Sequence, residues 1–122
     1  METGDLSMDQ RRAKGAWRCV EKGCSKEYVS HASGASALVM GNGLMQALAY
    51  YQNKRGEAEA LGRDIRGWLF RGPEDQVGSL DFRTAMSKLM TCSPSDFLGF
   101  TEEALAYLKW LRQFAKATQK DG

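Results

Sequence analysis

The stretch that decides the fold is GNGLMQALAYYQNK, residues 41–54, in which two glycines bracket an asparagine ahead of an alanine- and leucine-rich segment. Glycine and asparagine tolerate positive φ angles, so Gly41-Asn42-Gly43 predicts the end of one helix and a tight turn. Asn42 is then expected to help cap a second helix over about 44–54, which Gly56 closes. The stretch therefore predicts a corner between two antiparallel helices.

Similar signals place further helices on both sides of this corner. SMDQ at 7–10 matches a capping box, in which the Ser7 hydroxyl and the Gln10 side chain each bind the other's backbone N–H. Ser93-Pro94-Ser95-Asp96 is a second start signal, with proline in the first turn. The pattern predicts helices over about 7–23, 27–40, 57–71 and 80–90, and a last one from 94 to about 118, in one piece or in two joined near Gly99.

Composition favours helix throughout. The 122 residues are 43% hydrophobic and 26% charged, with only two prolines, and β-branched residues are scarce beside Ala, Leu, Met, Lys, Arg and Glu. We expect an all-α chain that folds as a compact bundle of five to six helices. A single domain over 1–122 is expected, with flexible ends at 1–6 and 119–122.

Several features favour a cytoplasmic protein. No run of about 18 apolar residues is present to span a membrane, and the polar N-terminus, METGDLSMDQRRAK, does not match a signal peptide. Three irregularly spaced cysteines indicate a reducing compartment rather than a disulfide framework.

The residue types needed for catalysis are sparse, and we expect no catalytic residue, metal or cofactor. His31 is the only histidine, with no serine or cysteine in a nucleophile motif beside it. Cys19, Cys24, His31 and Cys92 could supply zinc ligands, but C-x4-C-x6-H matches no standard site. Neither GxxxxGK[ST] nor GxGxxG occurs, so no phosphate-binding loop is encoded.

Basic residues are the more informative pattern. Four recur on one face of the first helix, which we call the first cationic row, and three on the last helix, which we call the second cationic row. The first row comprises Arg11, Lys14, Arg18 and Lys22, and the second comprises Lys109, Arg112 and Lys116, with Lys120 at the same spacing. Such rows are typical of solvated helix faces, or of a track that neutralises a phosphate backbone without selecting bases. The net charge of only +2 allows both interpretations.

Aromatic residues mostly fall on or beside the inner faces of the predicted helices. Ala13, Ala16, Trp17 and Val20 share one apolar stripe, so Trp17 is expected in the core. Stacking of such rings on nucleic-acid bases is the alternative.

Three segments carry a resemblance to a known family. MDQRRAKGAW at 8–17, GNGLMQALAYY at 41–51 and TEEALAYLKWLRQFAKA at 101–117 resemble, in this order, the small helical subunit of type III-B CRISPR effector complexes, the Cmr or RAMP-module assemblies. The resemblance covers about half of the chain clearly and does not extend to 71–79 or 91–99.

The resemblance implies an all-α subunit without enzymatic activity that stacks in the minor filament of the complex. Its implied partners are the guide RNA and the single-stranded target RNA, contacted through their backbones, together with the other backbone and large Cmr subunits and further copies of itself. Target cleavage and nucleotide cyclisation would belong to other subunits. Gly15 and Gly67, inside predicted helices, are departures that permit a close approach of a helix or of RNA, or are simply tolerated.

Two other function classes stay open. The chain could be a protein-interaction adaptor whose cationic rows meet acidic surfaces of neighbouring subunits. It could also be a helix-turn-helix DNA-binding protein, although the helix after the corner carries few side chains suited to reading bases.

Overall fold

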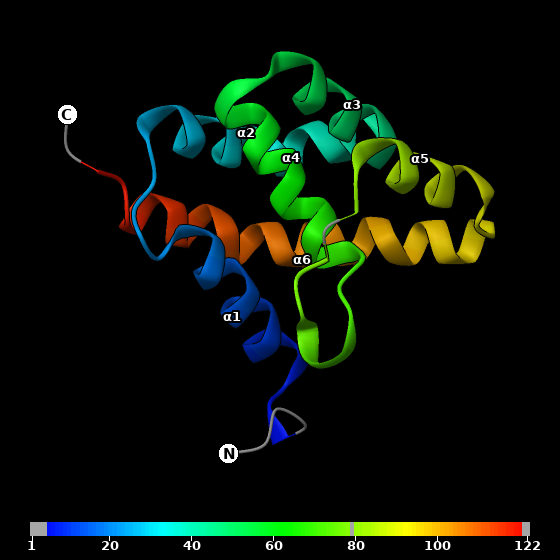
Figure 1. Ribbon diagram of the computed structural model, residues 1–122, viewed down its shortest axis with the longest axis horizontal. Helices are drawn as coiled ribbons and strands as arrows, with labels where there is room; N and C mark the ends of the chain where they lie inside the picture. The colour runs from blue at the N-terminus through cyan, green and yellow to red at the C-terminus, as the bar shows by residue number, and fades with distance from the viewer. Residues whose placement is uncertain (1–4, 79, 121–122) are drawn as a thin grey trace.

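The computed structural model describes residues 5–78 and 80–120, and this part of the chain is an all-α bundle, as predicted (Figure 1). Its elements are α1 (Met8–Val20), α2 (Lys26–Asn42), α3 (Leu44–Lys54), α4 (Gly56–Leu69), the short 3₁₀ helix η2 (Pro73–Asp75), α5 (Phe82–Thr91) and α6 (Pro94–Ala117). None of the described helices is both long and apolar enough to cross a membrane.

Side-chain caps set most of the helix starts. The predicted capping box is present, because Ser7 Oγ accepts from Gln10 N at 3.1 Å while Gln10 Oε1 accepts from Ser7 N at 2.8 Å. Ser93 caps α6 in the predicted way, with Pro94 in the first turn. The last helix is one continuous element of 24 residues that passes through Gly99 without a break.

The corner at 41–43 differs from the prediction in one respect. Gly41 and Asn42 are the last residues of α2, and only Gly43, with φ +89°, separates the helices. The α3 N-terminus has no side-chain cap. Because Gly43 alone supplies the positive φ, Asn42 stays helical, and the prediction that its side chain helps cap α3 was wrong.

α6 runs along the longest axis of the molecule (Figure 1). α1 packs on one side of it, while α2 and α4 pack against it elsewhere. Backbone hydrogen bonds join the α1–α2 connection to the segment that follows α6. Cys24 N donates to Thr118 O at 3.0 Å, and Lys120 N donates to Cys24 O at 2.8 Å. The core between the helices contains mainly leucine, alanine and aromatic side chains.

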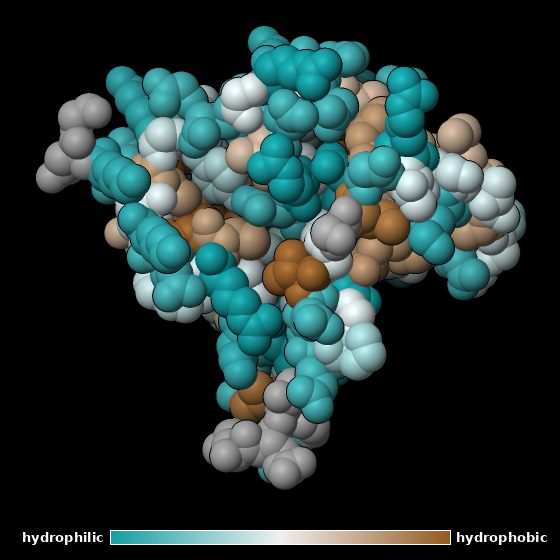
Figure 2. Space-filling model, in the orientation of Figure 1, coloured by the Kyte–Doolittle hydropathy of each residue, from teal (hydrophilic) through white to brown (hydrophobic). Residues whose placement is uncertain are grey.

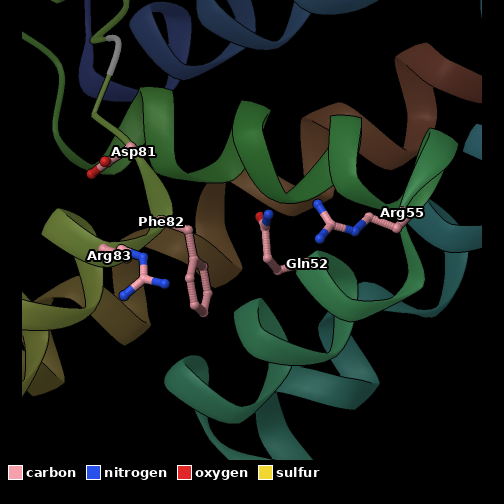
Figure 3. A pocket seen from close by; sticks show the side chains of 5 residues that line it. All are labelled: Gln52, Arg55, Asp81, Phe82 and Arg83. Atoms are coloured by element: carbon pink, nitrogen blue, oxygen red, sulfur yellow. The ribbon is translucent and has the colours of Figure 1, made fainter.

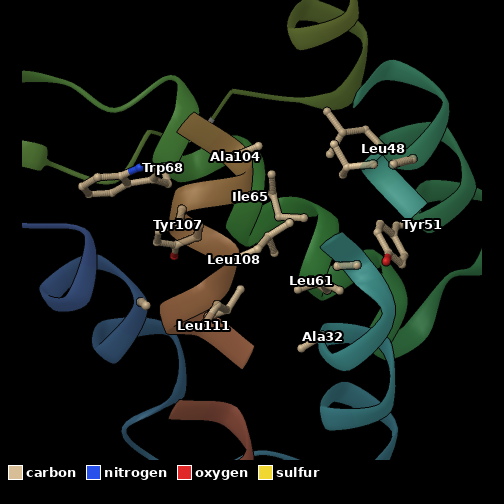
Figure 4. Packing of buried hydrophobic residues seen from close by; sticks show 14 of the residues in the cluster. Ala32, Leu48, Tyr51, Leu61, Ile65, Trp68, Ala104, Tyr107, Leu108 and Leu111 are labelled. Atoms are coloured by element: carbon tan, nitrogen blue, oxygen red, sulfur yellow. The ribbon is translucent and has the colours of Figure 1, made fainter. Parts of the chain in front are cut away.

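Trp68 on α4 lies where three helices meet (Figure 4). Its ring stacks on Tyr107 of α6, with centroids 5.1 Å apart and planes 5° from parallel. A Cβ on Gly15 of α1 would lie only 2.7 Å from two carbons of this ring. The indole Nε1 donates to Glu103 Oε2 at 2.9 Å, and Arg12 donates to both oxygens of that carboxylate at 2.7 and 2.9 Å. Gly15 is therefore a site of close helix approach.

A half-buried carboxyl group, that of Asp64, lies between α2 and α4. Tyr28 Oη donates to Asp64 Oδ2 at 2.6 Å, and in the described residues Asp64 has no ion pair with an arginine or lysine. Burial raises the pKa of Asp64, an effect that the hydrogen bond from Tyr28 opposes. Asp64 is thus the reverse of Glu103, whose pKa is lowered because Arg12 and Trp68 outweigh the burial of its carboxyl.

The glycine contacts predict opposite effects of two identical substitutions. Gly15→Ala should lower the free energy of unfolding, because overpacking costs about 1–3 kcal/mol and the stacked Trp68 ring has no room to shift. Gly34→Ala on α2 should raise it by about 0.5–1 kcal/mol, because a Cβ there meets nothing within 4 Å. Urea denaturation of the two variants measures both, and a gain for Gly15→Ala equal to that for Gly34→Ala would contradict the packing described here.

Asp64→Asn should stabilise the protein at neutral pH, since it keeps an oxygen that can accept from Tyr28 and removes a half-buried charge that desolvation disfavours. A folded pKa above the unfolded value of about 3.9 means that the contribution of Asp64 to stability is full below that pH and is lost as pH rises through the folded pKa. The advantage of the variant should therefore be present at pH 7 and disappear below about pH 4. Denaturation midpoints over this pH range, with the exposed Asp5→Asn as control, test the sign; an advantage that is independent of pH would refute it.

Candidate nucleic-acid interface

The first cationic row divides into two kinds of residue. Lys14 and Lys22 are exposed and form no ion pair with the described carboxylates. Arg18 is also exposed, and its Nη1 donates to the backbone oxygen of Asp75 at 3.3 Å. Arg11 instead belongs to an internal ion pair, a partner that the sequence pattern did not indicate.

Asp75 is the acceptor that engages Arg11. Arg11 Nε and Nη2 donate to its two carboxylate oxygens at 2.8 and 2.7 Å, and Arg71 Nε donates at 2.9 Å. The hydrogen bonds from the two arginines lower the pKa of Asp75, with Arg11 contributing most. Two consecutive positive φ angles, 55° at Glu74 and 59° at Asp75, turn the loop toward α1. Arg11 thus holds the loop after α4 and is less available to an external phosphate.

The second cationic row is exposed along α6. Lys109, Arg112 and Lys116 all lie on the solvent side and form no ion pair with the described carboxylates. The buried face of the same helix consists of Ala104, Tyr107, Leu108, Leu111 and Ala115. The predicted separation of an apolar face from a cationic one is therefore present on α6.

Trp17 is not in the core, and that prediction was wrong. Its side chain is 43% exposed and meets Phe114 of α6 edge to face, with ring centroids 5.5 Å apart and planes at 79°. Phe114 in turn contacts Trp110, at 5.7 Å between centroids. We call Trp17, Phe114 and Trp110 the aromatic seam. The stripe prediction failed because Trp17 lies at its edge, where the large indole extends past the buried Ala16 and Val20.

Two shallow grooves follow the aromatic seam between α1 and α6. One, of about 440 Å³, is lined by Ala13, Lys14, Trp17, Arg18, Glu21 and Phe114. The other, of about 390 Å³, is lined by Asp9, Arg12, Ala106, Lys109, Trp110 and Gln113. Members of the first row and Lys109 of the second thus border one aromatic surface. The only sequence signal for it was the position of Trp17 between Lys14 and Arg18.

A pocket of about 550 Å³ lies on a different side of the bundle, between the α3–α4 junction and α5 (Figure 3). Gln52, Arg55, Asp81, Phe82 and Arg83 line it. Two of its charged groups already have partners, because Asp81 Oδ1 accepts from Thr84 N at 2.9 Å and Arg55 pairs with Glu59 at 3.5 Å. The pocket is therefore the space where α3, α4 and α5 meet, and internal contacts already engage two of its charged side chains.

The cysteine, histidine and acidic side chains considered for catalysis or metal binding do not form a common site in the described part of the chain. Among the described residues no group of three or more His, Cys, Asp and Glu side chains is placed to hold a metal ion. Burial raises the pKa of Cys19 to about 12, so its thiol stays protonated at neutral pH and is a poor nucleophile. The His31 ring packs edge to face on Tyr51, with 6.1 Å between centroids. This arrangement suits packing rather than acid–base chemistry.

Hydrophilic residues cover most of the face seen in Figure 2, where the hydrophobic ones form small separate areas. Among the residues that the structure describes, the large apolar ones that are most exposed are Met40, Met90, Leu98, Val77, Trp17 and Tyr50. Among these, Trp17 is the one that lies between two cations of the first row.

The fold is shared with a known protein family. The model of the family described as CRISPR-associated protein (Cas_Cmr5) matches residues 8–118. A similar solved structure is the X-ray crystal structure of a CRISPR-associated Cmr5 family protein from Thermus thermophilus, which is 28% identical with a TM-score of 0.77. The match covers 94% of this chain and 100% of that one. No curated protein matches the chain.

The family match spans all of the described helices, from the first residue of α1 to the residue after α6. It confirms the resemblance found in the three sequence segments. The chain belongs to the Cmr5 family of CRISPR-associated proteins, the small helical subunits of Cmr systems.

Proposed function

We propose that this protein is a non-catalytic subunit of a type III-B RNA-guided effector complex that binds RNA backbone through its two cationic rows. The RNA is the guide strand, the target strand or both, and the contacts neutralise phosphates without selecting bases. Other Cmr subunits, and neighbouring copies of this chain, hold it along the guide–target duplex. The same proposal places the protein and its complex in the cytoplasm.

One observation carries the proposal: the exposed cations of both rows have no carboxylate partner in the described part of the chain, while a carboxylate already engages Arg11. A lysine or arginine that is not paired can release the counterions of a phosphate on contact. We assign the main role to Lys14, Lys22, Lys109, Arg112 and Lys116. Arg18 assists them, and Arg11 acts mainly by holding the loop at 71–78.

The absence of enzymatic activity is part of the proposal and has separate support. The protonated Cys19 thiol and the packed His31 ring give no nucleophile with an adjacent base. RNA cleavage and nucleotide cyclisation are accordingly assigned to other subunits.

The test removes the second row and measures salt dependence. The triple variant Lys109→Gln, Arg112→Gln, Lys116→Gln, assembled with its partner subunits, should bind single-stranded target RNA more weakly. Each phosphate contact adds about 0.7 to the slope of log K against log salt for single strands, so three lost contacts should reduce that slope by about 2. Binding is measured by fluorescence anisotropy over a several-fold range of salt concentration.

A matched control removes the same number of positive charges as the second-row variant, but from other helices. Lys54→Gln, Arg83→Gln, Lys88→Gln removes three exposed cations from α3 and α5, and it should leave the salt slope unchanged. Equal slopes for the wild type and both variants would show that the second row does not contact RNA.

The alternative function is a protein-interaction adaptor, favoured by the exposure of Met90 and Leu98 at 65% and 59% near the α5–α6 turn. Ultraviolet crosslinking of the assembled complex separates the two functions. Peptides of α1 and α6 linked to RNA support direct binding, whereas crosslinks to protein alone support the adaptor. Purification of the tagged protein from its host without guide RNA or Cmr partners would refute both.

A further inference from the structure

The exposed Trp17 has a feature that phosphate binding does not require. Trp17 and Phe114 meet edge to face, with ring centroids 5.5 Å apart. Such a contact covers much less ring area than parallel stacking does, so part of the Trp17 indole surface stays open. The 43% exposure of the Trp17 side chain is unusual for so large an aromatic residue. By contrast Trp68 is only 2% exposed, its ring stacks on Tyr107, and its indole N–H donates to Glu103.

The groove beside Trp17 has the dimensions and the composition of a site for a planar ligand. Its volume of about 440 Å³ lies in the range of roughly 300–1,000 Å³ that is usual for small-molecule sites. Its lining combines the apolar side chains of Ala13, Trp17 and Phe114 with two cations, Lys14 and Arg18. Glu21 is the one acidic residue that lines it.

The cations decide between possible occupants. An apolar peptide would leave Lys14 and Arg18 without partners, whereas a nucleic-acid strand supplies a phosphate beside every base. Aromatic rings flanked by cations are the usual way to bind a single strand without selecting its sequence, because every base has a π face. In a duplex those faces are covered by neighbouring base pairs, so the occupant must be an unpaired segment.

We propose that Trp17 stacks on a base of single-stranded RNA in the groove between α1 and α6, with Lys14 and Arg18 on the adjacent phosphates. This inference rests on the proposed RNA binding and adds to it a specific contact with an unpaired nucleotide. Phe114 supports the indole from α6. At the other end of the aromatic seam, Trp110 is held by Asp9, whose Oδ1 accepts from Trp110 Nε1 at 3.2 Å.

The experiment compares two polyanions with the same backbone. The full chain is titrated at low salt with a short oligouridylate and with an abasic ribose-phosphate strand of equal length. Trp110→Phe serves as the background, so that Trp17 is the accessible indole beside the buried Trp68. Oligouridylate should quench tryptophan fluorescence, and the abasic strand should bind without quenching.

Substitution of Trp17 provides the second readout. Trp17→Ala should weaken oligouridylate binding roughly 5- to 150-fold, the range expected for the loss of one stacked base, and leave the abasic strand unaffected. Trp17→Phe, which keeps a smaller ring, should recover part of the loss. Met40→Ala removes a more exposed apolar side chain from α2 and should change neither affinity; circular dichroism verifies that each variant is folded.

The outcomes separate this inference from the proposed function. Equal affinity of Trp17→Ala and wild type for oligouridylate, or an equal loss for both strands, would overturn stacking while leaving phosphate binding intact. Binding of neither strand by the wild type would overturn both proposals. Trp17-dependent binding of polyglutamate in place of oligouridylate would also overturn both, and would identify the groove as a site for an acidic protein segment.

Discussion

The packing of the Trp68 ring between Gly15 and Tyr107 is the constraint on which the rest of the structure depends. It brings α1, α4 and α6 to one point, and each partner is suited to the contact: glycine leaves room for the indole, and tyrosine offers a parallel ring. The indole N–H would be costly to bury without an acceptor, and Glu103 supplies one. Because Arg12 binds the same carboxylate, the charge of Glu103 is compensated inside the interface.

The same tryptophan connects the core to the surface where the cationic rows lie. The Arg71 guanidinium lies over the Trp68 ring at 3.9 Å and binds Asp75, which in turn binds Arg11 of α1. This chain of contacts fixes the orientation of α1 relative to the loop at 71–78. The direction in which the first row points is therefore set by contacts that begin in the core.

Helix positions could be predicted from the chain because their causes are local. Ser7 and Ser93 cap their helices through residues three positions away, and a pattern of that length is visible in a sequence. The surroundings of Trp17 and Arg11 could not be predicted in the same way. Their partners, Phe114 and Asp75, are far away along the chain, and periodicity within α1 gives no information about either.

The division of work between arginine and lysine explains why the rows overlap only in part with the cations that remain free. Every ion pair in the described residues uses an arginine, namely Arg11, Arg12, Arg55 or Arg71, and none uses a lysine. The planar guanidinium group binds a carboxylate through two parallel hydrogen bonds, as at Asp75 and Glu103, whereas an ammonium group gains less from such a site and is more strongly hydrated. Arg11, Arg12 and Arg71 accordingly join helices and loops, whereas Arg112 and the lysines of both rows keep their charge at the surface. A spacing pattern that treats both residue types as equal therefore overestimates the free charge of the first row and is more accurate for the second. The cations left over after the internal pairs are formed, rather than the net charge of +2, determine where a polyanion can bind.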